Sequence, residues 1–335
     1  MHKYASTVSV AVAGGSGYAG QELLRILARH PKTALAAAMT SSPDSAARPL
    51  PRLARVWDGQ LEPLSVDRLA GADAVFLAVP EAASAALVPD LQARGVKRIF
   101  DLSGAFRLRD LDLRHTWYPA TASQPDGLVY GLTELAKDAI ASARVVACPG
   151  CYPTAALLAL QPLAEAGLLN LAHGIVIDAK SGISGAGRTP TDRTHFSEVH
   201  GSVAAYGIFA HRHAAEIEQQ LGADVTFVPH LVPLDRGILE TIYVRVRPGV
   251  TAFEIEAAFT AAYEDAPFVR LTGDALPEVK HVAHTNFCDI GWRFDAPSHR
   301  LVLVSCIDNL VKGAAGQAVQ NFNVAFGLDE SEGLA

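Results

Sequence analysis

The stretch Val8-Ser9-Val10-Ala11-Val12-Ala13-Gly14-Gly15-Ser16-Gly17-Tyr18-Ala19-Gly20 decides the fold of this chain. Residues 8–13 form an apolar run typical of a buried strand, and the glycines that follow predict a tight turn. Apolar positions at helical spacing over residues 21–29 then predict a helix that ends before Pro31. This order favours a dinucleotide site over a purely structural turn, because glycines let the backbone approach a pyrophosphate that helix N–H groups can bind.

Strands and helices alternate over the first half of the chain. Apolar runs predict further strands at residues 34–39, 74–79, 97–101 and 144–147, and a helix over residues 81–93. This alternation indicates an α/β fold with a parallel sheet and helices on both faces. We therefore expect a Rossmann-type nucleotide-binding domain over residues 1–150.

The pattern changes after residue 151. Strands are predicted at residues 174–179, 223–228, 239–247, 286–294 and 300–307. They are long and partly alternating, which indicates a second, mixed α+β domain over residues 151–308. The last helix, over residues 309–327, begins with small residues that allow close packing, and we expect it to complete the first domain.

Composition excludes several classes of function. Of 335 residues, 50% are hydrophobic and 19% charged, which suits a globular protein with full cores. The net charge is −7 without a basic block, so neither nucleic acid nor an anionic membrane is an expected partner. No apolar run is long enough for a membrane span or a signal segment, so we expect a cytoplasmic protein with reduced cysteines.

The end of the second strand bears on the choice of coenzyme. An NAD site would place Asp or Glu there to bind the ribose 2′-hydroxyl. The chain has Met39-Thr40-Ser41-Ser42 with Arg48 nearby, which suits a 2′-phosphate and favours NADP, although Asp44 would favour NAD if it is not a turn residue. The residues expected to contact the coenzyme in this domain are Gly14, Gly15, Ser16, Gly17, Tyr18, Ala19, Gly20, Ser41, Ser42, Arg48 and Pro80.

A second informative stretch is Pro149-Gly150-Cys151-Tyr152-Pro153-Thr154-Ala155. A short apolar strand precedes it, and residues 154–166 have helical spacing, so Cys151 should lie at a helix start. Unpaired N–H groups and the positive end of the helix dipole favour a thiolate there. Taken alone, such a cysteine is more often a small buried residue in a turn.

Seven sequence blocks together resemble the N-acetyl-gamma-glutamyl-phosphate reductase family. They span residues 14–23, 101–108, 130–132, 149–154, 181–188, 211–217 and 308–313, in the family's order and over nearly the whole chain. The first and last blocks also resemble aspartate-semialdehyde dehydrogenase, a related enzyme whose cysteine usually lies in an Asn-Cys-x-Thr setting. One position departs from the reductase pattern, because residue 148, usually Asn, is Cys here.

The resemblance implies a step of arginine biosynthesis. N-acetyl-gamma-glutamyl phosphate and NADPH would give N-acetylglutamate 5-semialdehyde, phosphate and NADP. It also implies a homodimer or homotetramer, with catalysis and oligomerisation assigned to the second domain. The alternatives are a reductase for a homologous acyl phosphate of the aminoadipyl or aspartyl type, and a non-catalytic sensor that binds NADP.

The proposed reaction needs a nucleophile and a proton acceptor. Cys151 would attack the acyl phosphate and hold the acyl group as a thioester. His213 is the expected acid/base and His211 the second choice, while Glu216, three residues further along a helix, could fix the imidazole tautomer of His213. The alternative for these histidines is a solvated basic patch at a helix start.

A substrate with a carboxylate and a phosphate also needs cationic and N–H partners. Arg107 with Ser103 is one expected anion site, and Arg188 with Ser181 and Gly185 in the glycine-rich turn is the other. The alternative for either arginine, if it lacked these flanking blocks, is a solvated surface residue. The further expected contacts are Tyr206 with the substrate, unless it only packs in the core, and Asn309 and Lys312 with the coenzyme or the domain junction.

Cys148 and Cys151 form a Cys-x-x-Cys spacing. A structural zinc site usually pairs this spacing with a second one, which the sequence lacks, so we expect no metal. One hypothesis is that Cys148 and Cys151 form a disulfide under oxidation and thereby inactivate the enzyme reversibly. The simpler interpretation is that Cys148 is a packing substitute for Asn.

Overall fold

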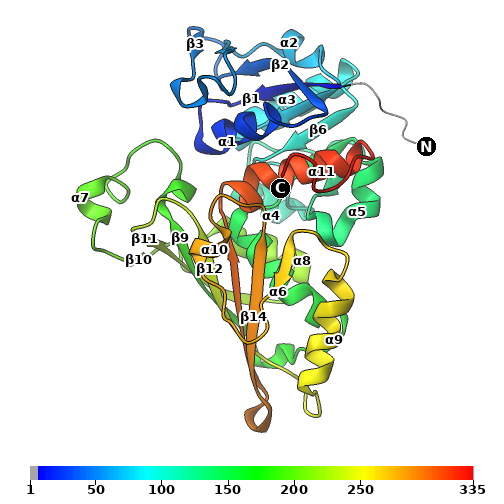
Figure 1. The fold of residues 1–335 in the computed structure, drawn as a ribbon, viewed down its shortest axis with the longest axis vertical. Helices are drawn as coiled ribbons and strands as arrows, with labels where there is room; N and C mark the ends of the chain where they lie inside the picture. The colour runs from blue at the N-terminus through cyan, green and yellow to red at the C-terminus, as the bar shows by residue number, and fades with distance from the viewer. Residues whose placement is uncertain (1–6, 335) are drawn as a thin grey trace. The chain divides into compact units, whose positions relative to one another are not determined.

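A computed structural model describes residues 7–334. The chain divides into two compact units (Figure 1). Unit 1 contains the chain up to Pro149 together with the segment from Ala314 onwards, and unit 2 spans Gly150–Gly313. The described helices include none with both the length and the apolar character that a membrane span requires.

Unit 1 is built on a six-stranded parallel sheet with the order β2-β1-β5-β6-β8-β7. Its strands are β1 (Val8–Ala13), β2 (Thr33–Met39), β5 (Ala74–Leu77), β6 (Arg98–Asp101), β7 (Leu128–Tyr130) and β8 (Val145–Ala147). A two-stranded ribbon follows β2 and is formed by β3 (Arg48–Pro49) and β4 (Gln60–Leu61). The predicted α/β class with a Rossmann-type sheet is confirmed.

Helices cover both faces of this sheet, so its strand β5 is apolar throughout. Val75 and Leu77 of β5 pack against α2 (Val66–Ala70) and α3 (Glu81–Ala93). Phe76 of the same strand stacks on Phe100 at 4.9 Å and also contacts Phe322 of α11 (Gly316–Ala325). Successive residues of a strand point to opposite faces, so four consecutive apolar residues in β5 are required. The remaining helices of the unit are α1 (Tyr18–Leu27), α4 (Leu111–Trp117) and α5 (Thr133–Ser142).

The C-terminal segment differs from the single helix that we predicted over residues 309–327. Residues Val311–Ala315 form a π-helix, and α11 begins only at Gly316. Buried amides fix α11 within unit 1, since Asn321 Nδ2 donates to the carbonyl of Gly131 at 2.9 Å and Thr133 Oγ1 donates to Asn321 Oδ1 at 2.6 Å. Polar residues on a fully buried helix are stable here because such bonds satisfy them.

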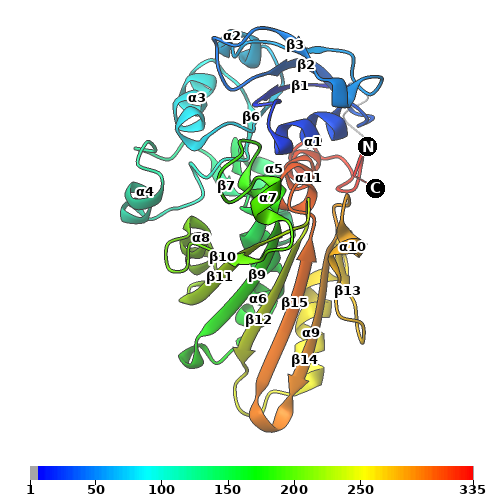
Figure 2. The ribbon, with the colours of Figure 1, turned by 90° about the vertical axis from the view of Figure 1, so that its left-hand side faces the viewer.

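Unit 2 contains a seven-stranded mixed sheet with the order β10-β11-β9-β12-β15-β14-β13. Its strands are β9 (Ile175–Gly182), β10 (Ala204–Ala205), β11 (Val225–Val232), β12 (Ile238–Arg245), β13 (Val269–Leu271), β14 (Cys288–Asp295) and β15 (Arg300–Ile307). The long antiparallel strands β12, β15 and β14 run side by side (Figure 2). The predicted mixed α+β architecture is confirmed.

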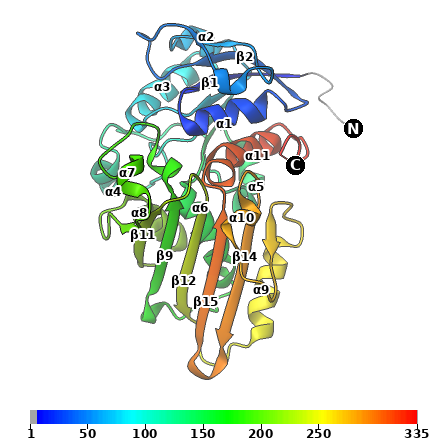
Figure 3. The ribbon, with the colours of Figure 1, turned by 60° about the vertical axis from the view of Figure 1, so that its left-hand side comes forward.

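Three helices cover one face of this sheet, namely α6 (Cys151–Glu165), α8 (Arg212–Leu221) and α9 (Ala252–Tyr263) (Figure 3). Thr251 and Glu254 form the predicted capping box of α9. On the opposite face Tyr243 of β12 is 45% exposed and Val176 of β9 is 39% exposed. The sheet is therefore covered on the helix side and presents apolar groups on the other. Two short helices, α7 (Phe196–Val199) and α10 (Val279–Val282), complete the unit.

Candidate active site

Cys151 is the first residue of α6, as the sequence predicted. Gly150 is the N-cap residue with φ −68° and ψ 155°, and within the described part of the chain no side chain caps this helix. The first turn of α6, at the positive end of the helix dipole, thus lies beside the partly exposed thiol, where it favours negative charge. Pro153 occupies a first-turn position, where its missing N–H costs no helical hydrogen bond.

A buried carboxylate supports the turn that carries Cys151. Glu216 of α8 is fully buried, and its Oε1 accepts a 2.8 Å hydrogen bond from the Gly150 N–H. This bond links α8 directly to the start of α6. The sequence predicts that Glu216 orients His213. That role stays a prediction, in addition to the observed hydrogen bond to Gly150.

His211 is the N-cap residue of α8, and its Nδ1 accepts a 3.1 Å hydrogen bond from the backbone N–H of His213. A neutral imidazole whose Nδ1 accepts carries its proton on Nε2. Burial, followed by the positive charge of Arg212, lowers the pKa of His211 to about 4. At neutral pH His211 is therefore an uncharged ring with a fixed Nε2–H donor.

Aromatic rings enclose the two histidines. The Tyr152 ring lies 5.8 Å from the rings of both His211 and His213, and the Tyr206 ring lies 5.6 Å from that of His211. The hydroxyls of Tyr152 and Tyr206 are 3.1 Å apart. Burial raises the pKa of both tyrosines, so their hydroxyls stay protonated and can donate hydrogen bonds. Tyr152 is a member of this cluster that the sequence analysis did not single out.

The glycine-rich turn after β9 is tightly fixed. A Cβ on Gly182 would lie 2.7 Å from the Arg236 backbone, which explains the glycine there. Asn309 holds both segments, because its Oδ1 accepts from the Gly237 N–H at 2.7 Å and its Nδ2 donates to Ser184 Oγ at 3.0 Å. Ser181 is buried and donates to the Gly182 carbonyl at 3.0 Å, whereas Gly185 and Arg188 are exposed.

Lys312 is predicted to contact the coenzyme or the domain junction. Its side chain is fully buried, and Nζ lies 5.8 Å from the centroid of the Phe268 ring in unit 2. A buried ammonium over an aromatic face is a cation–π arrangement. The predicted role of Lys312 stays a prediction. The same holds for Asn309, whose amide bonds to Gly237 and Ser184.

In unit 1 the glycine turn after β1 brings backbone segments into close contact. Gly14 has φ +85°, and a Cβ there would lie 2.1 Å from the Ala78 carbonyl oxygen. A Cβ on Gly20 would lie 2.2 Å from the Gly14 oxygen, so helix and turn pack backbone to backbone. At Gly17, the N-cap of α1, the nearest atom to such a Cβ is 3.7 Å away. A helix start of this kind can bind an anionic group through its N–H groups.

The residues after β2 provide hydroxyl groups in place of a carboxylate. Thr40 is buried, and its Oγ1 donates to the Ser42 carbonyl at 2.8 Å. Ser42 Oγ accepts from the Asp44 N–H at 3.2 Å, so Ser42 forms the turn in which Asp44 lies. Ser41 and Arg48 are exposed, as is Pro80, the N-cap residue of α3.

Arg107 and Ser103 have architectural partners in unit 1. The buried Arg107 donates from Nε to the Cys148 carbonyl and from Nη2 to the Leu102 carbonyl, both at 2.8 Å. Ser103 Oγ donates to the buried carboxylate of Asp101 at 2.9 Å. These bonds fix the segment after β6. Binding of substrate by Arg107 and Ser103 stays a prediction.

The surroundings of Cys148 favour packing over redox chemistry. Its thiol is buried in unit 1, where Asn321 Nδ2 donates to Sγ at 3.7 Å. Burial raises the pKa of Cys148 to about 12. Thiol–disulfide exchange proceeds through the thiolate, so a buried, protonated thiol reacts poorly. Over residues 7–334 no group of His, Cys, Asp and Glu side chains has a geometry suited to a metal ion.

Comparison with known proteins gives consistent results for both units. Residues 9–143 match the family model of the semialdehyde dehydrogenase NAD binding domain, and residues 151–309 match that of the semialdehyde dehydrogenase dimerisation domain. The N-acetyl-gamma-glutamyl-phosphate reductase of Brevibacillus brevis is 43% identical over 340 residues, covering 98% of each chain. That of Symbiobacterium thermophilum is 44% identical over 341 residues, covering 98% of this chain and 97% of the relative.

Solved structures show the same fold at low identity. Aspartate semialdehyde dehydrogenase II of Vibrio cholerae, complexed with ASA, has a TM-score of 0.67 at 18% identity, covering 96% of this chain and 98% of the other. Aspartate semialdehyde dehydrogenase of Candida albicans, solved with NADP, has a TM-score of 0.66 at 15% identity, covering 96% and 99%. With both family models matched in order and relatives above 40% identity along almost the whole chain, this protein is an oxidoreductase that belongs to the N-acetyl-gamma-glutamyl-phosphate reductase family.

Proposed function

We propose that this protein reduces N-acetyl-gamma-glutamyl phosphate to N-acetylglutamate 5-semialdehyde and phosphate with NADPH, through a thioester on Cys151. The observation that carries the proposal is the position of Cys151 at the uncapped start of α6, with Gly150 held by Glu216. The names of the relatives supply the substrate. The step belongs to arginine biosynthesis, and the cytoplasm is the compartment we expect for it.

The first half of the reaction uses the thiol. Cys151 Sγ attacks the acyl carbon, the bond between that carbon and the phosphate oxygen breaks, and phosphate leaves with the electron pair. The first-turn N–H groups of α6 bind the oxyanion that forms as the carbonyl is attacked. His213 accepts the thiol proton, and Arg188 with the turn at residues 181–187 binds the departing phosphate.

The second half releases the aldehyde. NADPH, when bound, supplies the hydride that adds to the thioester carbon. The resulting oxyanion collapses and expels the Cys151 thiolate, which leaves the semialdehyde. His211 donates its Nε2–H to the oxyanion in both halves, and its low pKa keeps it from competing with His213 for the thiol proton. Tyr206 orients the substrate through its hydroxyl.

The coenzyme site that we propose lies in unit 1. The turn at residues 14–20 binds the pyrophosphate at the start of α1. Ser41, Ser42 and Arg48 would hold the ribose 2′-phosphate, which would make NADP the preferred coenzyme, and Pro80 would be a further contact of the coenzyme.

We also propose that the protein is a homo-oligomer, either a dimer or a tetramer. The match of residues 151–309 to a dimerisation domain supports this, as do the apolar groups Val176 and Tyr243 on the uncovered face of the unit 2 sheet.

The test is an assay in the reverse direction. The enzyme is given NADP, phosphate and N-acetylglutamate semialdehyde, and in parallel the aspartate and aminoadipate semialdehyde analogues. We expect phosphate-dependent formation of NADPH with the first substrate and the highest kcat/KM for it. Preference for an analogue would move the assignment to a homologous acyl phosphate, and no turnover despite NADP binding would indicate a sensor.

A further inference from the structure

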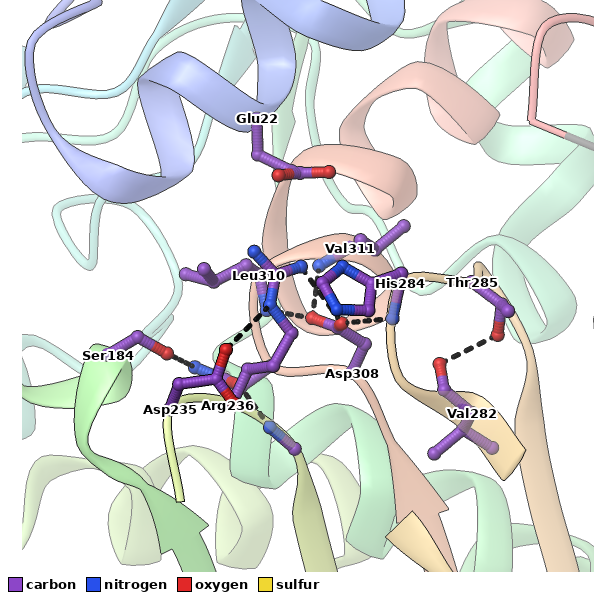
Figure 4. Close-up of polar contacts among 12 residues, drawn as sticks. Glu22, Ser184, Asp235, Arg236, Val282, His284, Thr285, Asp308, Leu310 and Val311 are labelled. Atoms are coloured by element: carbon purple, nitrogen blue, oxygen red, sulfur yellow. Dashed lines mark hydrogen bonds and ion pairs between the residues drawn. The ribbon is translucent and has the colours of Figure 1, made fainter. Parts of the chain in front are cut away.

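One buried carboxylate holds the segment that follows β15. Asp308 Oδ1 accepts the backbone N–H groups of Leu310 at 2.8 Å and Val311 at 3.1 Å. Its Oδ2 accepts from Arg236 Nη1 at 3.1 Å and from the His284 N–H at 2.6 Å (Figure 4). Asp308 is fully buried, so it joins three separate segments of unit 2 at a single point.

The segment that Asp308 caps has an unusual backbone. Residues Val311–Ala315 form a π-helix, and the Gly313 N–H donates to the Asp308 carbonyl at 2.9 Å, five residues back along the chain. Single π-turns are rare and frequently occur at functional sites. Capping by the Asp308 side chain at residues 310 and 311 fixes where this turn begins.

Gly313 in this turn lies directly against Cys151. A Cβ on Gly313 would be 2.7 Å from Cys151 Cβ, 3.2 Å from its Cα and 3.2 Å from Ile307 Cδ1. Real side chains do not tolerate the first of these distances, so only glycine permits the observed position of the cysteine. The bare Cα of Gly313 is thus part of the surface on which the Cys151 side chain packs.

We infer that Asp308 and Gly313 are positioning residues for Cys151. The carboxylate fixes the π-turn, and the glycine of that turn sets where the thiol lies. This inference rests on the proposed role of Cys151 as nucleophile. A displacement of about 1 Å at a reacting atom can cost on the order of a hundredfold in rate, so a residue that never touches substrate controls catalysis in this way.

The first test compares Gly313→Ala with Gly71→Ala. Gly71 has a helical φ of −75°, and its added Cβ would meet its nearest atom at 3.6 Å, which is ordinary contact. We measure KM, and kcat normalised to the amount of Cys151 thiol that iodoacetamide titrates in a separate sample. We also measure the rate of alkylation by iodoacetamide and the affinity for NADP. Gly313→Ala should lower kcat by about ten- to a hundredfold and change the alkylation rate, with KM and NADP affinity nearly unchanged. Gly71→Ala should match the parent.

A purely structural role for Gly313 would lower the melting temperature and the fraction of active protein while leaving kcat per titrated thiol unchanged. That result overturns the inference. The inference is also overturned if folded Gly313→Ala has the same kcat and alkylation rate as the parent.

The second test compares Asp308→Asn with Asp235→Asn, and it decides the question if Gly313→Ala does not fold. The Asp308 carboxylate accepts all four of its hydrogen bonds from N–H groups, two at each oxygen. Asparagine has one acceptor oxygen in place of two, so its NH₂ group would face two of these N–H donors. Asp235 is 87% exposed and lies 4.0 Å from Arg236 Nε, so its substitution makes the same charge change beside the same arginine without touching the π-turn.

Asp308→Asn should lower kcat and change the alkylation rate about tenfold or more, while Asp235→Asn stays within about twofold of the parent. Equal behaviour of the two variants overturns the inference. Alkylation of Cys151 needs no substrate, so this readout works even if the parent enzyme shows no turnover. If Gly313→Ala and Asp308→Asn are alkylated at the rate of the parent, the positioning role is refuted. Loss of turnover in the parent alone refutes only the proposed function.

Discussion

The backbone N–H of Gly150 donates a 2.8 Å hydrogen bond to the buried carboxylate of Glu216, which lies on another helix 66 residues further along the chain. The bond fixes the residue immediately before Cys151. On the proposed function, this bond holds the first turn of α6 where charge at Cys151 develops. The acidic residue of the His-Arg-His block is thus part of the support for the thiol, whatever it also does for His213.

Removal of this acceptor should damage both stability and rate. Glu216→Ala leaves the Gly150 N–H without its acceptor in the interior, which costs about 1–3 kcal/mol of unfolding free energy, and it should lower kcat. Glu216→Gln retains a carbonyl oxygen that can accept the same bond, so its loss should be smaller. Urea unfolding and steady-state kinetics measure both variants. Equal losses for Ala and Gln would show that the hydrogen bond to Gly150 is not what Glu216 contributes.

His211 should make stability depend on pH in acid. Its folded pKa of about 4 lies below the ordinary value of 6.5, so the unfolded chain binds the extra proton first as the pH falls. The contribution is therefore complete above about pH 6.5 and is lost as the pH falls towards 4. His211→Asn can still cap α8 but does not titrate, so its unfolding free energy should fall less over this range. Parallel curves for parent and variant would contradict the assignment.

Glu240 should have the opposite dependence. This carboxyl group on β12 is fully buried, and neither oxygen has a hydrogen-bond partner among the described residues. Burial raises the pKa of Glu240 well above its ordinary value of 4.5, because the interior disfavours the charged form. Its contribution is complete below pH 4.5 and is lost as the pH rises through the folded pKa.

Glu240→Gln has nearly the same shape and cannot ionise. Urea titrations at two pH values, one near 4.5 and one in the alkaline range, should therefore show an unfolding free energy that exceeds that of the parent by more at the higher pH. If the difference between Glu240→Gln and the parent is the same at both pH values, the carboxyl group is not the titrating group in this range.

Arg48 should determine the preference for NADP. Arg48→Glu places a like charge near the 2′-phosphate, so KM for NADP should rise by about tenfold or more while KM for NAD stays nearly constant. Arg52→Glu is the matched control, since Arg52 is an exposed arginine in the 3₁₀ turn Pro51–Leu53 that follows β3. Equal changes in KM for both coenzymes, or equal effects of the two substitutions, would remove Arg48 from the phosphate site.

Local patterns in the sequence predict much of the fold and part of the candidate site. The glycine turn after β1 and the place of Cys151 at a helix start depend on residues that are neighbours in the chain, so periodicity and turn chemistry reveal them. The two architectures followed from the alternation of elements. Tyr152 could have been found as well, because an aromatic residue next to the proposed nucleophile is visible in the sequence.

Other features depend on packing that the sequence does not display. The bond between Gly150 and Glu216 and the contact between Gly313 and Cys151 join distant segments. The π-turn has no hydrophobic period of its own, so the sequence predicts a single helix over residues 309–327. Glu240 occupies a polar position in a strand but shares a face with Ile238 and Ile242, and the burial of that face is a tertiary property.

The most direct measurement of the central claim is the intact mass of the enzyme mixed with NADP and N-acetylglutamate semialdehyde in the absence of phosphate. Without phosphate the thioester cannot be released by phosphorolysis. We predict one N-acetylglutamyl group per chain, mapped to Cys151 by peptide analysis, with one equivalent of NADPH formed and the group released when phosphate is added. No adduct, an adduct on another residue, or turnover in Cys151→Ala would contradict the account.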